Sequence, residues 1–190
     1  MSAYFKVLFL VAVVCTSLVS GQKSLSATLE QKLNDQINLE YEALYLYDQL
    51  AAYFSRSNKA LFGFAAYFKK AASEERDHAH ELTELVTKRL GTVIYKEIPI
   101  TTSKLNSESS VVALKIALQK EIDVSASLRE LYEQAQSDKD VHIQDQLDHF
   151  VNEQVDAIYN LKSLITRLEG KGDTVEFLLD QELKSAPSMH

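Results

Sequence analysis

Four long segments of the chain carry apolar residues at alternating steps of three and four residues. This spacing places the apolar side chains on one face of an α-helix, where they can pack into a core. The segments cover about residues 27–55, 61–90, 110–137 and 141–169, and a shorter segment of the same kind covers 173–184. The whole chain contains only five glycines and two prolines, so helix breakers are few. The pattern predicts an all-α protein with four long helices and a short fifth helix.

The connections between these segments predict how the helices are arranged. Few residues separate the first helix from the second, or the third from the fourth, so each pair should be antiparallel. A longer link, 91–108, separates the two pairs and could run the length of a bundle. We therefore expect one four-helix bundle with a long crossover between helices two and three and an added C-terminal helix.

Polar and glycine residues near the segment ends are candidate helix caps. Ser57 or Asn58 could cap the start of the second helix, and Gly91 its end. Asp138 or Asp140 could cap the start of the fourth helix, because a short acidic side chain accepts hydrogen bonds from the first free amides.

The first 21 residues have the layout of a secretory signal peptide. Lys6 precedes an apolar run over 7–15, and small residues follow, with cleavage expected after Ser20 or Gly21. The run is short for a membrane span. Cys15, the only cysteine, lies inside it. We expect a signal peptide over 1–21, one domain over 22–190, and a protein that is secreted or held in the lumen of the secretory pathway, with no membrane association.

The formal net charge of the chain is −7. A nucleic-acid-binding protein usually carries a basic excess, so nucleic acid is not expected as a partner. An acidic chain is compatible with cationic partners, and equally with a charge that serves only solubility.

Single polar residues interrupt the apolar stripe of each long helix. They are Glu40 in the first helix, Glu75 and His78 in the second, Glu121 in the third and Gln154 in the fourth. Burying an unpaired carboxylate is costly, and three converging carboxylates repel one another. A bound cation removes this repulsion, and carboxylates with an imidazole suit iron. These five residues on four helices together predict a metal centre inside the bundle that can hold two ions.

Two neighbouring residues have open alternatives. Glu74 lies off the stripe, as a solvated residue or as a link to a further metal position. Tyr47 lies two turns after Glu40 on the same face, as a core aromatic with a hydrogen bond or as a phenol acting beside the metals. Gln154 is a weaker ligand than Glu, which suits an ion that must leave after reaction.

At these residues the sequence resembles the ferritins, over about residues 27–184. The matching stretches are Asn38-Leu39-Glu40, Tyr45-Leu46-Tyr47, Glu74-Glu75-Arg76-Asp77-His78-Ala79, Glu121 and Asn152-Glu153-Gln154-Val155. The resemblance implies a ferritin-like four-helix bundle and a hollow shell of twenty-four subunits, built from this chain alone or together with other ferritin chains. It also implies that iron enters through three-fold channels.

The resemblance further implies a role for each residue of the centre. Glu40, Glu75 and His78 would bind the first iron, Glu75 would bridge both irons, Glu121 would bind the second, and Gln154 would lie beside it. Tyr47 matches the tyrosine that ferritins carry near this centre. The implied reaction is ferroxidase chemistry, in which dioxygen or peroxide oxidises Fe²⁺ and the ferric product is stored as an oxide mineral.

Asp145 and Asp148 match the paired carboxylates of the ferritin iron channel. A ring of carboxylates would attract Fe²⁺ and steer it inward. The alternative is an acidic cluster that solvates the start of the helix.

The chain also departs from some di-metal bundles. Helix four lacks a second Glu-x-x-His, and the only methionines, Met1 and Met189, lie outside the helices, so haem is not expected. The bacterial relatives suggest an accessory iron site from Glu74, Glu153 and Asp156 as a weaker alternative.

Three functions are compatible with this sequence. The first is a ferroxidase subunit for iron storage and detoxification. The second is a structural shell subunit that only nucleates mineral, but such subunits lose ligands at the centre and here every position is filled. The third is a metal-free secreted bundle that binds a receptor or lipid, for which aliphatic residues would be expected in place of the buried carboxylates.

Overall fold

The computed structural model describes residues 24–99 and 109–185. Within them lie five helices, which confirms the predicted all-α bundle. They are α2 (Ala27–Ser55), α3 (Phe62–Lys88), α4 (Ser110–Ser137), α5 (Val141–Leu168) and α6 (Asp173–Ser185). The predicted signal peptide with its cysteine, and the later part of the crossover, lie outside the described residues. None of the described helices is both long and apolar enough to span a membrane.

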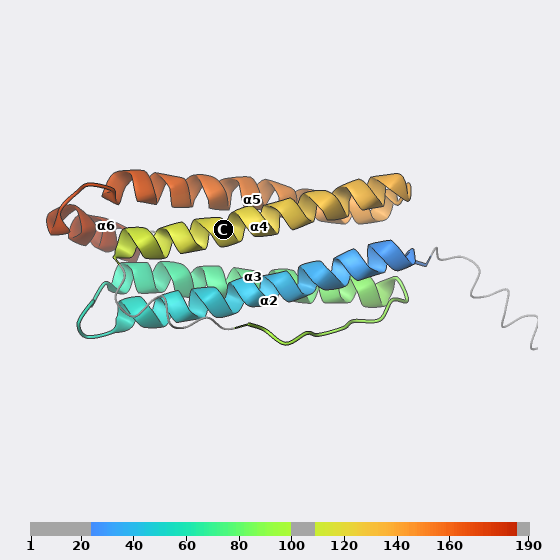
Figure 1. Cartoon of the computed structure of the whole chain (residues 1–190), viewed down its shortest axis with the longest axis horizontal. Helices are drawn as coiled ribbons and strands as arrows, with labels where there is room; N and C mark the ends of the chain where they lie inside the picture. Colours follow the sequence, from blue (N-terminus) through green and yellow to red (C-terminus); the bar gives the residue numbers. More distant parts are fainter. Residues whose placement is uncertain (1–23, 100–108, 186–190) are drawn as a thin grey trace, which may run out of the picture.

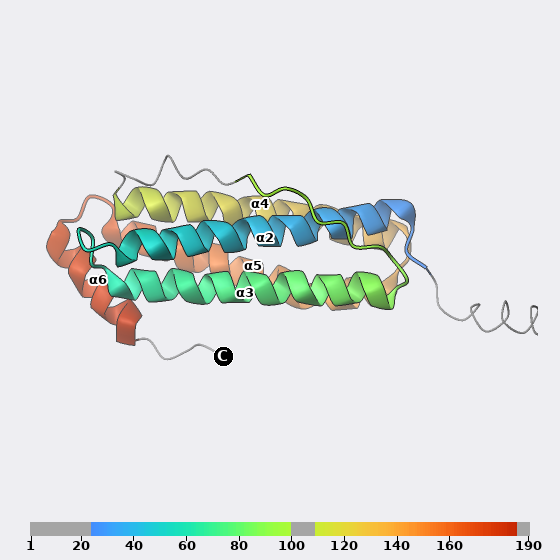
Figure 2. The same ribbon diagram turned by 90° about the horizontal axis from the view of Figure 1, so that it is seen from below.

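The four long helices form two antiparallel pairs. Figure 1 shows α2 beside α3 in one layer and α4 beside α5 in the other, with α3 and α4 running in the same direction. Only a connection that returns along the bundle can join two helices of the same direction, which accounts for the long crossover. The α6 helix lies across one end of the bundle, where it packs mainly against α3 and slightly against α5 (Figure 2).

Two asparagines of α2 hold the first part of the crossover. Asn34 donates to the carbonyl of Thr92 (2.9 Å) and accepts from the amide of Ile94 (2.6 Å). One turn later, Asn38 donates to the carbonyl of Ile94 (2.8 Å) and accepts from the amide of Lys96 (2.6 Å). The two side-chain amides thereby satisfy the backbone of an extended segment that has no strand partner among the described residues. Figure 2 shows this segment lying along α2.

The start of α3 is capped by a residue from α6 rather than by its own sequence. The prediction that Ser57 or Asn58 caps this helix was wrong, because Leu61 occupies the N-cap position and makes no side-chain cap. Instead Asp180 Oδ1 accepts from the amides of Gly63 (2.6 Å) and Phe64 (3.0 Å). A carboxylate here satisfies two free amides and complements the positive end of the helix dipole.

The end of α3 differs by one residue from the prediction. Leu90, with φ of 61°, takes the left-handed position after the helix, and Gly91 comes next. The amide of Gly91 donates to the carbonyl of Val86 (2.9 Å) and closes a Schellman motif. Glycine is needed at 91 for space, since a Cβ there would lie 2.9 Å from the Val86 side chain.

Asp140 begins α5, as predicted, and its side chain accepts from the amide of Ile143. The same carboxylate forms a buried, two-pronged ion pair with Arg89 at the end of α3, with distances of 3.0 and 2.6 Å. Two buried charges are stable here because each satisfies the other with direct hydrogen bonds. This pair ties the far ends of the two layers together.

The core face of α5 passes through Phe150, which is buried, while the next residue, Val151, is exposed. Steps of 147–150–154 and 147–151–154 both fit helical periodicity, and the larger aromatic residue takes the core position.

Candidate metal centre

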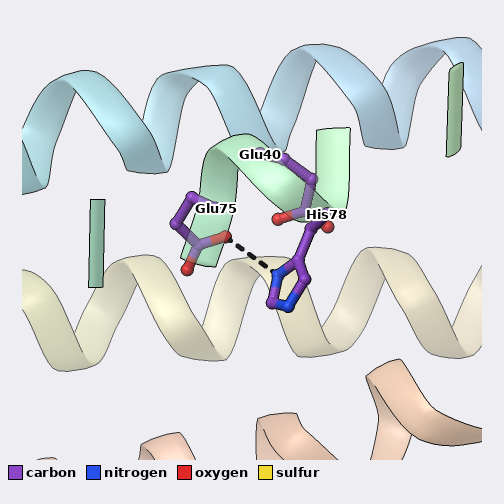
Figure 3. Close-up of side chains that lie close together, drawn as sticks. All are labelled: Glu40, Glu75 and His78. Atoms are coloured by element: carbon purple, nitrogen blue, oxygen red, sulfur yellow. Dashed lines mark ion pairs between the residues drawn. The ribbon is translucent and has the colours of Figure 1, made fainter. Parts of the chain in front are cut away.

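Glu40, Glu75 and His78 converge between α2 and α3. Each offers one ligand atom, and these atoms all lie within 4.8 Å of one another. Glu75 and His78 lie three residues apart on α3 and share one face of the helix, and Glu40 faces them from α2. Figure 3 shows the three side chains grouped together, with Nδ1 of His78 3.5 Å from Oε2 of Glu75. The structure therefore brings together the three residues predicted to bind the first ion.

The two carboxylates are almost fully buried but only partly satisfied. Glu40 is 1% exposed and Glu75 is 6% exposed. Gln36, one turn before Glu40, donates to Glu40 Oε1 at 2.7 Å. The other oxygen of Glu40 and Oε2 of Glu75 receive no hydrogen bond in the described part of the chain. Such oxygens are costly to bury, and a cation between them would satisfy both. The donor set of two carboxylates and one imidazole suits iron.

Glu121 from α4 and Gln154 from α5 complete the other side of the centre. The carboxylate of Glu121 accepts from the Tyr47 hydroxyl and from Nε2 of Gln154, which also donates to the Glu121 carbonyl at 2.9 Å. All three side chains are buried. The hydroxyl and the amide fix the carboxylate while leaving it free to accept a metal. Gln154 uses its nitrogen for this contact, so its oxygen remains available on the same side chain.

Burial raises the pKa values of all three glutamates, and repulsion by a neighbouring glutamate of the centre adds to this at Glu40 and Glu75. Desolvation, followed by the negative charge of Glu121, raises the pKa of Glu75 to about 8. Desolvation and the neighbouring Glu75 raise the pKa of Glu40 well above its ordinary value. Desolvation also raises the pKa of Glu121, although hydrogen bonds from Tyr47 and Gln154 oppose it. The metal-free centre therefore holds protons near neutral pH, and a cation would displace them.

Aromatic residues close the centre on the side toward α6. Tyr47 packs on Phe68, with ring centroids 5.8 Å apart, and Tyr67 meets Phe68 edge-on at 5.1 Å. Desolvation and the charge of Glu121 raise the pKa of both tyrosines. Both phenols are therefore protonated at neutral pH. The spacing of Tyr47 from Glu40 predicted its place near this site, whereas Tyr67 lies one residue off the apolar stripe and was not predicted.

Several predicted residues lie outside the buried cluster. Glu74 is exposed and pairs with Lys70 at 3.2 Å. Asp145 and Asp148 are exposed on α5, and Asp148 hydrogen-bonds to Tyr132 of α4. Asp156 is also exposed. In a single subunit these four side chains face solvent, and none of them joins the cluster of Glu40, Glu75 and His78.

Two residues of the site were not predicted in the roles that the structure gives them. Gln36 lies four residues before Glu40, so the helical spacing could have indicated that it supports this carboxylate. Glu153 Oε2 lies 2.9 Å from Nε2 of His78, across the gap between α5 and α3. No local spacing indicates this contact, because the two residues are 75 positions apart.

Buried carboxylates from separate helices, with a Glu-x-x-His pair, place the protein in the class of ferritin-like bundles. Comparison with known families agrees, since the Ferritin-like domain family matches residues 30–170. The chain belongs to the ferritin family.

Ferritins of plants and animals are similar to this chain. The chloroplastic ferritin of Phaseolus vulgaris is 37% identical over 160 residues, which cover 81% of this chain and 63% of that protein. The soma ferritin of Lymnaea stagnalis is 34% identical over 174 residues, covering 90% and 99% of the two chains. The ferritin middle subunit of Salmo salar is 37% identical over 157 residues, covering 80% and 89%. The chain spans less than two thirds of the plant relatives but nearly the full length of the snail protein.

Proposed function

We propose that this protein oxidises Fe²⁺ at the buried centre and stores the ferric product. The observation that carries the proposal is the convergence of Glu40, Glu75 and His78 on one side of the centre with Glu121 and Gln154 on the other. Four helices contribute these groups. Among the described residues, one buried oxygen of Glu40 and one of Glu75 receive no hydrogen bond. Iron is the substrate of the reaction, and oxygen-rich ligands hold both its ferrous and ferric forms.

The chain's own groups support each part of this chemistry. Glu40, Glu75 and His78 would bind one ferrous ion, and the carboxylates of Glu75 and Glu121 would neutralise part of the charge of a second. Binding of both ions would displace the protons held by the metal-free carboxylates. Each ferrous ion gives one electron to dioxygen or peroxide, and water supplies the oxide and hydroxide of the mineral. Gln154, a neutral donor, binds the second ion less tightly than a carboxylate would, so the oxidised ion can leave.

The wider assembly is part of the same proposal. Membership of the ferritin family supports a hollow shell of twenty-four subunits, with a mineral core inside, formed by this chain alone or with other ferritin chains. The layout of residues 1–21 supports a protein directed to the secretory pathway.

A subunit that only nucleates mineral is the competing proposal. It would need a centre without ligands, whereas Glu40, Glu75, His78, Glu121 and Gln154 occupy the five positions of the centre, and all but His78 are buried. The observation therefore favours the ferroxidase.

Mixing the mature protein with Fe²⁺ in air and following the ferric absorbance tests the proposal. We expect fast oxidation, and a loss of at least about 100-fold in rate for Glu75→Ala, because this residue would bind both ions. Helical circular dichroism should be unchanged. Equal, slow oxidation in both proteins would point to the nucleation subunit.

A further inference from the structure

The two ring nitrogens of His78 face different carboxylates. Nδ1 lies 3.5 Å from Oε2 of Glu75, inside the cluster of candidate ligands. Nε2 lies 2.9 Å from Oε2 of Glu153, which reaches across from α5. The ring is also held edge-on by Phe150, with centroids 5.2 Å apart. His78 therefore has one nitrogen toward the centre and one toward a residue that the function proposed above does not use.

Only one nitrogen of a neutral imidazole can bind a metal, because the other carries the proton. A carboxylate accepts a hydrogen bond but cannot donate one when ionised, so Glu153 fixes the proton on Nε2. The lone pair is then on Nδ1, which is the nitrogen that faces Glu75. A carboxylate in this position also holds the plane of the ring and makes the metal-binding nitrogen more basic.

We propose that Glu153 is a positioning residue for His78, setting its tautomer and ring orientation so that Nδ1 is presented to the first iron. This inference rests on the proposed function, since it concerns the same centre. Glu153 acts through His78 and does not itself bind the ion. The side chain of Glu153 is 57% exposed, whereas that of His78 is 20% exposed.

The chain contains a matched control for this contact. Glu81 of α3 and His149 of α5 form a second carboxylate–histidine pair at 3.1 Å, between the same two helices. Glu81 is also 57% exposed. Its partner histidine lies outside the ligand cluster and stacks on Phe150, with centroids 4.0 Å apart. Losing the Glu81–His149 pair therefore changes surface charge and inter-helix contact but keeps the contact between Glu153 and His78.

Co²⁺ binding tests the proposal without depending on iron oxidation. Visible spectra of Co²⁺ titrated into the assembled protein should show about 10- to 100-fold weaker binding for Glu153→Ala. Glu153→Gln, whose amide oxygen can still accept from Nε2, should stay close to the wild type, and so should Glu81→Ala. Equal loss in the Gln and Ala variants would show that the charge of Glu153 binds the metal directly, and this would overturn the proposal. Unchanged binding in Glu153→Ala would also overturn it.

A crystal structure of the Zn²⁺-loaded protein provides a second measurement. The proposal requires a bond from the metal to Nδ1 of His78, with Glu153 hydrogen-bonded to Nε2. Zinc bound through Nε2, or by Glu153 itself, would overturn it. If both tests succeed but Fe²⁺ is not oxidised, the ferroxidase proposal fails while the role of Glu153 stands.

Discussion

At the scale of single residues, the centre buries carboxylates at positions where their negative charge is unfavourable unless a cation is bound. In the metal-free protein, protonation of the carboxylates lowers this cost, as the raised pKa values of Glu40, Glu75 and Glu121 indicate. Stability, metal binding and pH are therefore linked at this site.

The pKa of Glu75 predicts how the stability of the metal-free protein depends on pH. The folded pKa is about 8, above the ordinary value of 4.5 for a glutamate. Between these values the folded state binds more protons than the unfolded state, so the free energy of unfolding falls as pH rises. We expect the thermal midpoint of chelator-treated protein to drop from pH 5 to pH 8, and to drop less in Glu75→Gln. A midpoint that rises over this range would contradict the assignment.

At the scale of elements, contacts between segments far apart in sequence define the ends of helices and the path of the crossover. The side chains of α2 hold the crossover, and α6 supplies the cap of α3. Removing either contact should lower the free energy of unfolding by a measurable amount.

Asn38→Ala should release the crossover from α2. The variant loses the bonds to the backbone of Ile94 and Lys96, so we expect the free energy of unfolding to fall by about 1–3 kcal/mol. Hydrogen exchange at the amide of Lys96 should speed up, since its acceptor is gone. Asn38→Asp keeps this acceptor but loses the donor to Ile94, and should therefore protect the Lys96 amide while still destabilising the protein.

Gly63→Ala should push α6 away from the bundle. The new Cβ would lie 1.8 Å from the carbonyl oxygen of Asp180, a backbone atom that cannot rotate away. We expect a loss of about 1–3 kcal/mol in unfolding free energy and faster proteolysis of α6. Gly172→Ala is the control, because nothing lies within 4 Å of its Cβ position. Equal stability of the two variants would show that the close approach of α6 is not needed.

At the scale of the whole molecule, periodicity predicted the bundle and its polar interruptions predicted the centre. The reason is physical: a buried Glu40 or Glu121 stands out against an apolar stripe because desolvation makes it rare. Contacts between helices far apart in sequence could not be predicted from the sequence pattern in this way. Asp180 capping α3, and Glu153 reaching His78, depend on how helices far apart in sequence meet, and the choice of Phe150 over Val151 depends on how the core is filled.

Iron entry gives a prediction for the assembled protein. Asp145 and Asp148 are exposed on α5, as residues that line a channel between subunits must be in an isolated subunit. If they steer Fe²⁺ inward, Asp145→Ala with Asp148→Ala should slow iron oxidation several-fold, about as expected for lost electrostatic steering. Co²⁺ binding at equilibrium should be unchanged. If the rate of iron oxidation does not change, Asp145 and Asp148 serve only to solvate the start of the helix.

The cap on α3 also sets an order of events during synthesis. The ribosome releases α3 long before Asp180 exists, so the amides of Gly63 and Phe64 meet water until the final helix emerges. Glu75 and His78 lie three to four turns further along the same helix, well clear of this open end. A nascent chain can therefore bring its candidate metal ligands on α2 and α3 together first, and the last helix to leave the ribosome then closes this end of the bundle.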